Sequence, residues 1–358
     1  MARALSAPLL QTPLHAAHIE LGARMGPFAG WDMPIRYGDG QIAEHLAVRS
    51  TAGAFDVSHM GQIETSGPQA ADLLAHLCTN DVAAIPIGGA QYGLLLNDDG
   101  GVLDDVINYR LEADRFLTVT NAANHAGDRD WFRAHQGGFE AQITDRAGDY
   151  AMIAVQGPLA REIVQAVASA PLPERMTIGA RTINGAEALV AATGYTGEDG
   201  VEILLAPEDA PAVWNVVVRR GAKPAGLAAR DTLRTEACYH LYGNDLSSDR
   251  GPIEAGLGWA CRRGGGYIGA EAVEAARADP PPQKLVPFVV LDRGAARSGD
   301  QVIGGGVVTS GTFSPSLEQG IGLAYLPLTT ALPGTEFEID VRGKTRRARV
   351  EKRPLLKV

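Results

Sequence analysis

The 358-residue sequence has few cysteines, no excess of basic residues and no long hydrophobic run. Its three cysteines, Cys78, Cys238 and Cys261, are odd in number and far apart, which excludes a disulfide framework and a CxxC metal knuckle. No apolar run approaches the roughly 20 residues that a membrane-spanning helix needs. The N-terminal stretch MARALSAPLLQTPLHAAH has no apolar core suited to secretion. These absences predict a soluble, cytoplasmic protein with no membrane partner and no targeting segment.

Several functional classes are excluded by what else is missing. The formal net charge of −10 argues against a nucleic-acid partner, because neutralising phosphates requires a basic surface. GxGxxG, P-loop, HExxH and GxSxG motifs are absent. His15 and His18 have HxxH spacing, but no acid or cysteine lies close to them in sequence, so we favour a capping or surface role and expect no metal. A small molecule or another protein is the expected partner.

The length suits two or three domains, and the first 280 residues alternate helical with strand-like patterns. Ser66 is a candidate helix cap, with Pro68 in the first turn that follows it. Predicted helices cover 66–81, 156–168, 208–221 and 228–243. Predicted strands cover 92–98, 104–111, 115–121, 150–157, 187–194 and 200–207. The pattern predicts an α+β fold with mostly antiparallel sheets.

Three consecutive prolines at 280–282 end a helix and mark the clearest boundary. The segments that follow are short strands with turn signals and no clear helix: 285–293, 304–315, 320–327, 335–343 and 345–352. A small all-β domain is therefore expected at the C-terminus. The stretch 341–353 is basic within an acidic protein. It either attracts an acidic partner or protects an exposed strand edge by its charge.

The stretch GGVLDDVINYR, residues 100–110, places two adjacent carboxylates inside a predicted strand. Side chains alternate faces, so Asp105 shares a face with Leu103, Ile107 and Tyr109, whereas Asp104 lies on the opposite face. A carboxylate in apolar company has a raised pKa and suits proton handling or stabilisation of a cation. The alternative is that both acids cap the tight turn at 98–101.

A second group of polar residues lies in ATGYTGEDGVEILL, residues 192–205, where glycines mark a hairpin. Tyr195 is on the approach, and Glu202 lies on the outgoing strand among apolar residues. A carboxylate can accept two parallel N–H donors, as from the edge of a pterin, or it can be an ordinary surface acid. The helix at 228–243 carries Arg230 and Arg234 one turn apart, for which solvated charge is the default interpretation.

Five blocks of the sequence carry a family resemblance: FAGWDMPIRYGDGQIAEHLAVRSTAGAFDVSHMG, QYGLLLNDDGGVLDDVINYR, GYTGEDGVE, PAGLAARDTLRTEA and SGTFSPSLEQGIGLAYLP. Together they resemble the aminomethyltransferase (T-protein) family of the glycine cleavage system. The resemblance implies a three-domain cloverleaf around a central funnel, with a C-terminal jelly-roll or barrel-like all-β domain. The implied domains are residues 1–54 with 137–247, residues 55–136 with 248–279, and residues 283–358.

The resemblance also implies a reaction. The one-carbon unit of an aminomethyl group on the dihydrolipoyl arm of the carrier H-protein passes to the co-substrate tetrahydrofolate, which releases ammonia and forms 5,10-methylenetetrahydrofolate. No flavin or nicotinamide is implied. By motif, Asp105 matches the catalytic aspartate. Glu202 with Tyr195 matches the residues that hold the pterin, and Arg230 matches a folate-site arginine. The implied funnel lining is Tyr92, Tyr109, Asn121, Met60 and Tyr239. Arg297 resembles an arginine at the mouth, where the carrier's arm arrives.

The same fold serves other functions, so two alternatives stay open. One is a folate-dependent demethylase, and the other is a non-enzymatic folate-binding factor of iron-sulfur cluster assembly. The latter has a KGCYxGQE motif, whereas this chain reads GGGYIGAE, with Gly266 where the cysteine would stand. The chain also departs from the family at its end, KRPLLKV, where Leu355 or Leu356 would replace an aromatic residue against the folate.

Overall fold

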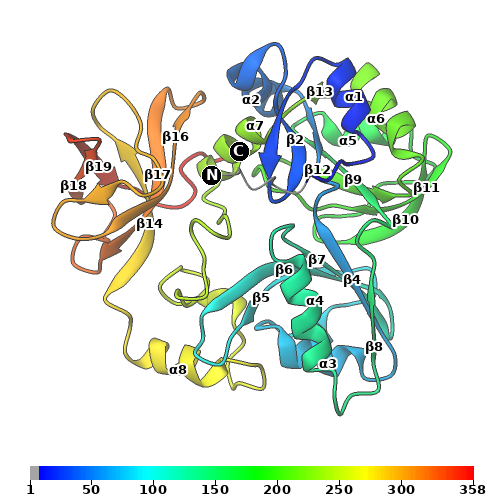
Figure 1. Ribbon diagram of the computed structural model, residues 1–358, viewed down its shortest axis with the longest axis horizontal. Coiled ribbons are helices and arrows are strands. Elements are labelled where there is room, and N and C mark those ends of the chain that lie inside the picture. The colour runs from blue at the N-terminus through cyan, green and yellow to red at the C-terminus, as the bar shows by residue number, and fades with distance from the viewer. Residues whose placement is uncertain (1–7) are drawn as a thin grey trace, which may run out of the picture.

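The computed structural model describes residues 8–358; residues 1–7, at which the first expected domain begins, lie outside the described residues. Two sheets and a closed barrel surround the centre of the molecule, with the barrel on the left in Figure 1, one sheet at the upper right and the other below. The helices are α1 (His15–Glu20), α2 (Gly40–Ser50), α3 (Ala70–Leu77), α4 (His125–Ala134), α5 (Ala160–Gln165), α6 (Ala210–Arg219), α7 (Leu227–Glu236) and α8 (Ala270–Ala278), with 3₁₀ turns η1 (Val82–Ala84) and η2 (Gly258–Ala260). The expected α+β fold is confirmed.

Each of the four predicted helical regions contains a helix, namely α3, α5, α6 and α7, but some boundaries differ. Ser66 is the last residue of a strand, and Gln69 is the N-cap of α3 without a side-chain cap bond, so the predicted cap was wrong. Helix α7 ends at Glu236 because Cys238 adopts a φ of 61°, which a right-handed helix cannot continue through. Helices α1, α2 and α4 were not predicted.

The first sheet gathers strands from distant parts of the chain. Its order is β10-β11-β12-β9-β3-β13, antiparallel except for the β13–β3 pair. Helices α5 and α6 pack against β9, as seen at the upper right of Figure 1. A core centred on buried Trp214 and the apolar side chains of β9 fills this interface. The strand bounds are β3 (Gly53–Asp56), β9 (Ala151–Gln156), β10 (Ile178–Ile183), β11 (Ala186–Ala191), β12 (Gly200–Leu205) and β13 (Lys223–Pro224).

The second sheet carries the two adjacent aspartates on its second strand. Its order is β5-β6-β7-β4-β8, and α3 and α4 cover one face, below the centre in Figure 1. The bounds are β4 (Gly61–Ser66), β5 (Ala90–Leu96), β6 (Val102–Glu112), β7 (Arg115–Thr120) and β8 (Gln142–Asp145). Strand β8 pairs with β4, so these residues join the second sheet, although the expected boundary at 137 put them with the first. The other domain boundaries stay a prediction.

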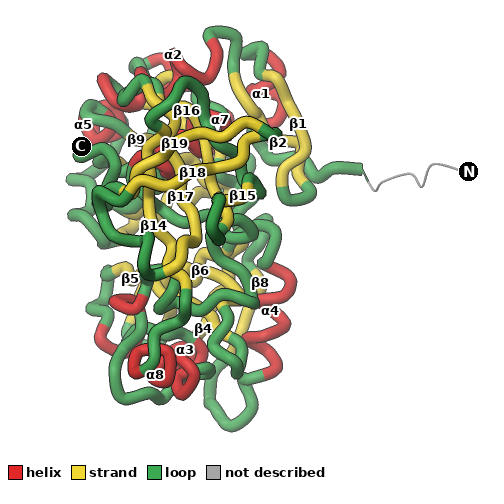
Figure 2. Tube along the Cα trace, turned by 90° about the vertical axis from the view of Figure 1, so that its left-hand side faces the viewer, coloured by secondary structure: helices red, strands yellow, loops and turns green. Residues whose placement is uncertain are grey.

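The C-terminal segment forms the expected all-β domain, a closed barrel in the order β14-β17-β16-β15-β18-β19, which faces the viewer in Figure 2. The basic strand β19 pairs with both β14 and β18, so its interpretation as an exposed edge was wrong. Two of its arginines lie opposite acids of β18. The bounds of the barrel strands are β14 (Gln283–Val290), β15 (Gln301–Val302), β16 (Val307–Ser314), β17 (Gln319–Pro327), β18 (Glu336–Val341) and β19 (Lys344–Val350). Outside the barrel and the two sheets, β1 (Arg24–Phe28) and β2 (Trp31–Arg36) form a separate antiparallel hairpin.

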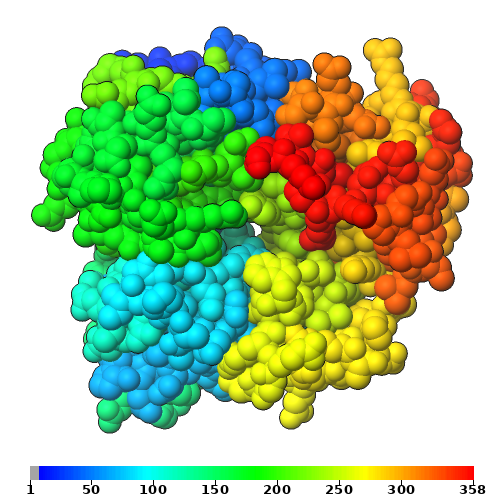
Figure 3. Space-filling view, turned by 180° about the vertical axis from the view of Figure 1, so that it is seen from behind, coloured from blue at the N-terminus to red at the C-terminus, as the bar shows by residue number. Residues whose placement is uncertain are grey.

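Helix α7 lies between α2 and the barrel and contacts both. Arg234, 1% exposed, donates to Asp245 at 2.7 Å and to Ser310 of β16 at 2.8 Å. Glu236, 0% exposed, accepts from Arg49 of α2 at 2.8 Å. The interpretation of this helix as solvated charge was therefore wrong. Figure 3 shows a small hollow at the centre of the molecule, with the C-terminal segment, in red, beside it.

His18 is fully buried, so the capping or surface role that we favoured for it was wrong. Its Nε2 lies 2.9 Å from Asp56 Oδ2 and its Nδ1 lies 2.8 Å from the Tyr37 hydroxyl. His15 contacts a different carboxylate, Asp32, at 2.9 Å. Within residues 8–358, no cluster of histidine, cysteine and acidic side chains has the arrangement that a metal ion needs. No helix in this part of the chain is long and apolar enough to cross a bilayer.

Candidate active site

Asp105 and Asp104 lie on opposite faces of β6, as strand alternation predicts, but their burial is the reverse of what their neighbours suggest. Asp104 is 0% exposed and lies on the face that packs into the second sheet's core with Val102 and Val106. Asp105 shares its face with Leu103 and Ile107, and these three side chains are only partly buried. The acid in apolar company is therefore the one that retains access to solvent.

The Asp105 carboxylate is held by two donors. The Tyr92 hydroxyl on neighbouring β5 donates to Oδ2 at 3.1 Å, and the Asn121 amide, just after β7, donates to Oδ1 at 2.9 Å. Burial, followed by the nearby Asp104 charge, raises the pKa of Asp105 to about 7. The group therefore changes charge near neutral pH, where a catalytic acid or base is most effective.

Asp104 holds the connection between β7 and α4. It accepts the Asn121 backbone N–H at 3.0 Å, the Asn121 side-chain amide at 2.8 Å and the Asn124 amide at 2.6 Å. The turn at 98–101 is closed instead by Asn97, whose Oδ1 accepts the Gly101 N–H at 2.7 Å. The alternative in which both acids cap that turn was therefore wrong.

Glu202 lies on β12 at the centre of a short hydrogen-bond chain. Thr193 donates to Glu202 Oε2 at 2.6 Å, and the Tyr109 hydroxyl lies 2.9 Å from Thr193 Oγ1. Because Thr193 has a single hydroxyl proton, Tyr109 is the donor in the second bond. The hairpin that presents Thr193 needs glycine at 194, where an added Cβ would lie 1.8 Å from Gln156 Oε1. Glu202 is thus oriented by both sheets.

Arg230 on α7 lies over the ring of Tyr195, with Cζ 4.7 Å from the ring centroid. Its Nη1 is buried without a hydrogen-bond partner in the described residues. Burial lowers the pKa of Arg230, and the negative charge of Glu202 opposes this effect. A buried donor without a partner is costly, so Nη1 is available to bind an acceptor from a ligand.

The two groups of residues face each other across the centre. Burial raises the pKa of Tyr195, and the charge of Asp105 adds to this increase, so the two side chains are close enough to interact. Tyr195 also stacks on Tyr239, with ring centroids 5.9 Å apart, and donates its hydroxyl proton to the His240 carbonyl. Met60 packs against the cluster that contains Tyr109. Residues far apart in the sequence are therefore assembled into one site.

Arg297 lies apart from this assembly, on the exposed loop between β14 and β15. It donates to Gly311 of the barrel at 2.9 Å. Leu355 packs into a cluster with buried Tyr325, and its backbone N–H donates to the Glu236 carbonyl at 3.0 Å. The structure thus gives Leu355 a role in joining the barrel to α7.

Sequence reasoning missed three residues of the site. Trp259, 68% exposed, stacks on Tyr92 with ring centroids 5.6 Å apart. Thr193 bridges Tyr109 and Glu202, as described above. Asp128 lies behind Asp104 on α4 and is 3% exposed. Asp128 lies one helical turn after Asn124, and residues four apart share a helix face. This spacing could have indicated that Asp128 lies on the same side of α4 as Asn124.

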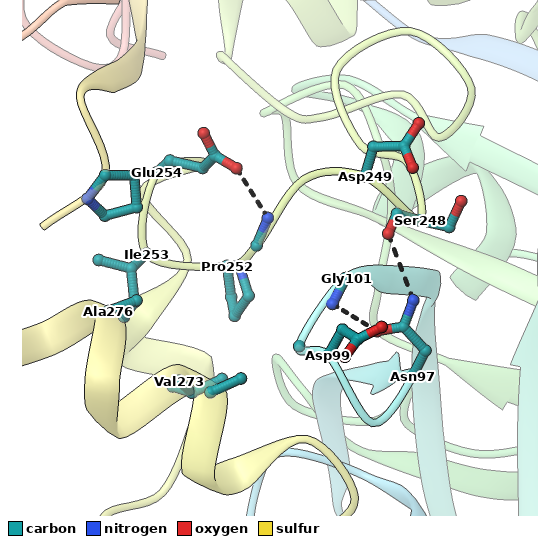
Figure 4. A pocket seen from close by; sticks show the side chains of 14 residues that line it. Asn97, Asp99, Gly101, Ser248, Asp249, Pro252, Ile253, Glu254, Val273 and Ala276 are labelled. Carbon is teal, nitrogen blue, oxygen red and sulfur yellow. Dashed lines mark hydrogen bonds between the residues drawn. The ribbon is translucent and has the colours of Figure 1, made fainter.

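A cavity of about 520 Å³ lies at a different place, between the 97–101 turn, the 248–254 loop and α8 (Figure 4). Asp99 and Asp249 lie at its rim, and Ile253 and Val273 form an apolar wall. Glu254 is already engaged by the Gly251 N–H at 2.9 Å. None of the predicted site residues lines this cavity.

Comparison with known proteins places the chain in a family. The model described as "GCVT N-terminal domain" matches residues 14–264, and the model described as "Glycine cleavage T-protein C-terminal barrel domain" matches residues 283–357. An aminomethyltransferase from Symbiobacterium thermophilum is 43% identical, covering 97% of both chains, and one from Saccharopolyspora erythraea is 45% identical, covering 93% of this chain and 94% of that one. The crystal structure of the glycine cleavage system aminomethyltransferase T from Bartonella henselae has a TM-score of 0.92 and 35% identity, covering 98% of both chains. The chain therefore belongs to the aminomethyltransferase family, the T-proteins of the glycine cleavage system, and is an enzyme of this type.

Proposed function

We propose that the protein transfers the one-carbon unit of the aminomethyl group on dihydrolipoyl H-protein to tetrahydrofolate. The products are ammonia, 5,10-methylenetetrahydrofolate and the reduced carrier. The observation that carries the proposal is the Asp105 carboxylate, which is partly buried, held by Tyr92 and Asn121 and near Tyr195 in the loop between β11 and β12. A fixed carboxylate in such a place suits a reaction that develops positive charge beside it.

The residues around the centre fit tetrahydrofolate. Glu202 has one oxygen bonded to Thr193, and within the described residues its other oxygen, Oε1, makes no hydrogen bond and can accept an N–H of the pterin edge. On α7, the Arg230 Nη1, which has no hydrogen-bond partner in the described residues, supplies a donor for the ligand. Tyr195, stacked on Tyr239 and covered by Arg230, holds the Arg230 guanidinium in place. The proposed lining also includes Tyr92, Tyr109, Asn121, Met60 and Tyr239. Tetrahydrofolate supplies the nitrogen nucleophile that accepts the one-carbon unit.

Asp105 is the proposed catalytic residue, and its charge is the property that the reaction uses. Loss of ammonia from an aminomethyl group generates positive charge at that group, which a nearby carboxylate stabilises. Because its pKa is about 7, Asp105 can also take up and release a proton near neutral pH. Tyr92 and Asn121 keep the carboxylate oriented, so little reorganisation is needed during the reaction.

The carrier H-protein is the proposed protein partner. Arg297 is exposed on a barrel loop and is proposed as a contact for the arm at the mouth of the site. The basic strand β19 is a second candidate contact for an acidic partner, although Glu336 and Glu338 of β18 lie opposite Arg349 and Arg347 and offset part of its charge. The cytoplasm is the proposed location, which agrees with three free, buried cysteines in a reducing compartment.

Two other functions of the same fold are less well supported. Iron-sulfur assembly factors of this fold carry a cysteine where this chain has Gly266, and Gly266 has a φ of 83°, a conformation that favours glycine over residues with a side chain. A cysteine could not replace it without backbone strain. A folate-dependent demethylase stays the enzyme alternative.

The test is to incubate the purified protein with aminomethylated H-protein and tetrahydrofolate and to measure ammonia release. We expect release that depends on both tetrahydrofolate and the protein. The matched control is Asp99→Asn, which removes a carboxylate from the exposed turn that precedes β6. Absence of folate-dependent ammonia release, together with demethylation of a methylated donor, would favour the demethylase.

A further inference from the structure

A third carboxyl group, that of Asp128, lies behind the two aspartates of β6. Asp128 is on α4, is 3% exposed and lies within hydrogen-bonding reach of Asp104, which is 0% exposed. Two ionised carboxylates have only acceptor atoms and repel each other, so a hydrogen bond between them requires that one of them carries a proton. This contact therefore contains a proton that the reaction described above does not account for.

The hydrogen-bond partners indicate which residue holds this proton. Asp104 accepts three N–H groups, from the backbone and side chain of Asn121 and from the side chain of Asn124. Burial raises the pKa of Asp104, but these bonds stabilise its ionised form and oppose that increase. Asp128 receives no comparable set of donors, and its Oδ2 is buried without a hydrogen-bond partner in the described residues. The proton therefore resides on Asp128, which donates it to Asp104.

Among residues 8–358, the surroundings of the three carboxyl groups supply no cation to replace that proton. On α4 itself, His125 and Arg129 flank Asp128 but bond to Asp145 of β8, at 3.0 and 3.2 Å. The other titratable groups that act on the three carboxyl groups are neutral at pH 7 and come from the facing elements: Tyr92 of β5, Tyr195, Tyr242 and Cys78. The cluster is thus a set of three acids in which only a proton relieves the repulsion.

We propose that Asp128 is a positioning residue, which stays protonated at neutral pH, anchors the Asp104 carboxylate and through it holds Asn121 against Asp105. The link is the Asn121 side-chain amide, whose two hydrogens reach Asp104 Oδ1 at 2.8 Å and Asp105 Oδ1 at 2.9 Å. Burial raises the pKa of Asp128 to about 10, whereas that of Asp105 rises to about 7, in line with this arrangement. The inference rests on the proposed catalytic role of Asp105.

The protonation state can be measured without any activity. Infrared difference spectra of protein with ¹³C-labelled aspartate report each protonated carboxyl by its C=O stretch. At about pH 8.5, above the pKa of Asp105 and below that of Asp128, we expect one protonated carboxyl in the wild type. The signal should disappear in Asp128→Asn and persist in Asp105→Asn. Absence of the signal from the wild type, or its persistence in Asp128→Asn, would overturn the proposal whatever the protein's activity.

The positioning role is tested by a pair of substitutions that differ in one hydrogen bond. Asp128→Ala removes the donor, and we expect kcat to fall by about tenfold or more while KM for tetrahydrofolate stays within about threefold. Asp128→Asn keeps an N–H donor toward Asp104, and we expect it to restore most of the turnover that Asp128→Ala loses. If Asp128→Asn is as impaired as Asp128→Ala, or if Asp128→Ala keeps its turnover, Asp128 does not act as a protonated donor to Asp104. Loss of ammonia release in the wild type would instead contradict the proposed function.

Discussion

Replacing Asp105 by Asn should make the enzyme slower and the fold more stable at the same time. Asn has nearly the same size and shape as Asp, so Tyr92 and Asn121 can stay close to it, but the negative charge is gone. We expect turnover to fall by about a hundredfold or more, the usual cost of removing one electrostatic group from an active site. The gain in stability has a different origin, the relief of an unfavourable charge.

The size of this gain follows from the pKa. Folding raises the pKa of Asp105 from 3.8 to about 7, which corresponds to roughly 4 kcal/mol against the ionised folded form above pH 7. The free-energy cost of roughly 4 kcal/mol is an upper bound, because Asp105 retains some access to water. Below about pH 4 the group is protonated in both the folded and the unfolded state and the cost vanishes. The cost therefore grows as the pH rises from about 4 to about 7 and is constant above that range.

The assay combines kinetics with thermal unfolding. Ammonia release should be about a hundredfold slower in Asp105→Asn, and the melting temperature should exceed that of the wild type by more at about pH 8 than at about pH 5. Asp104→Asn should instead lower the melting temperature, because Asp104 accepts three hydrogen bonds inside the sheet. Asp99→Asn, in the exposed turn, should change neither quantity. Turnover within a few-fold of the wild type, or a stability difference that does not grow with pH, would refute the reasoning.

Three further predictions test other parts of the site. Glu202→Ala should weaken tetrahydrofolate binding by roughly 1.5 to 3 kcal/mol, the value of a charge-assisted pair, and unchanged affinity by titration calorimetry would make Glu202 an ordinary hairpin residue. Tyr92→Phe removes a donor that lowers the pKa of Asp105, so the acid limb of the pH–rate profile should move to higher pH, and a limb that stays in place would contradict this contact. Arg234→Met leaves the buried carboxylate of Asp245 without its partner and should destabilise the protein by roughly 3 to 5 kcal/mol, whereas an unchanged melting temperature would show that the ion pair contributes nothing.

For the two aspartates, the sequence predicted which strand face each occupies but not how deeply each is buried. Strand alternation correctly separated Asp104 from Asp105, because the period of two is a property of the extended backbone itself. The apolar neighbours of Asp105 predicted that its carboxylate is desolvated, whereas Asp104 is the acid with no exposure. Which face of a strand is covered depends on what packs against it, and here α3 and α4 cover the face of Asp104.

The charged residues of α7 and the basic strand β19 also show that the sequence did not predict burial or pairing partners. Both were interpreted as exposed charge, yet Arg234 and Glu236 are buried in contacts with the barrel and α2, and β19 is paired along both sides. Their partners lie up to 187 residues away in sequence. Spacing along the chain carries no information about such partners, although a buried charge without one would be prohibitively unstable.

The sequence by itself determined the features that depend on short stretches of chain: the four predicted helices, the all-β character of the residues after the three prolines, and the opposite faces of Asp104 and Asp105. Local backbone geometry and hydrophobic periodicity decide these features, and both are written in neighbouring residues. The tertiary structure alone decided how the barrel closes, that Tyr109 reaches Thr193 across the centre, and that Asp128 lies beside Asp104. Contacts of this kind form only when distant segments pack together, since burial and the partners it brings are properties of the assembled fold.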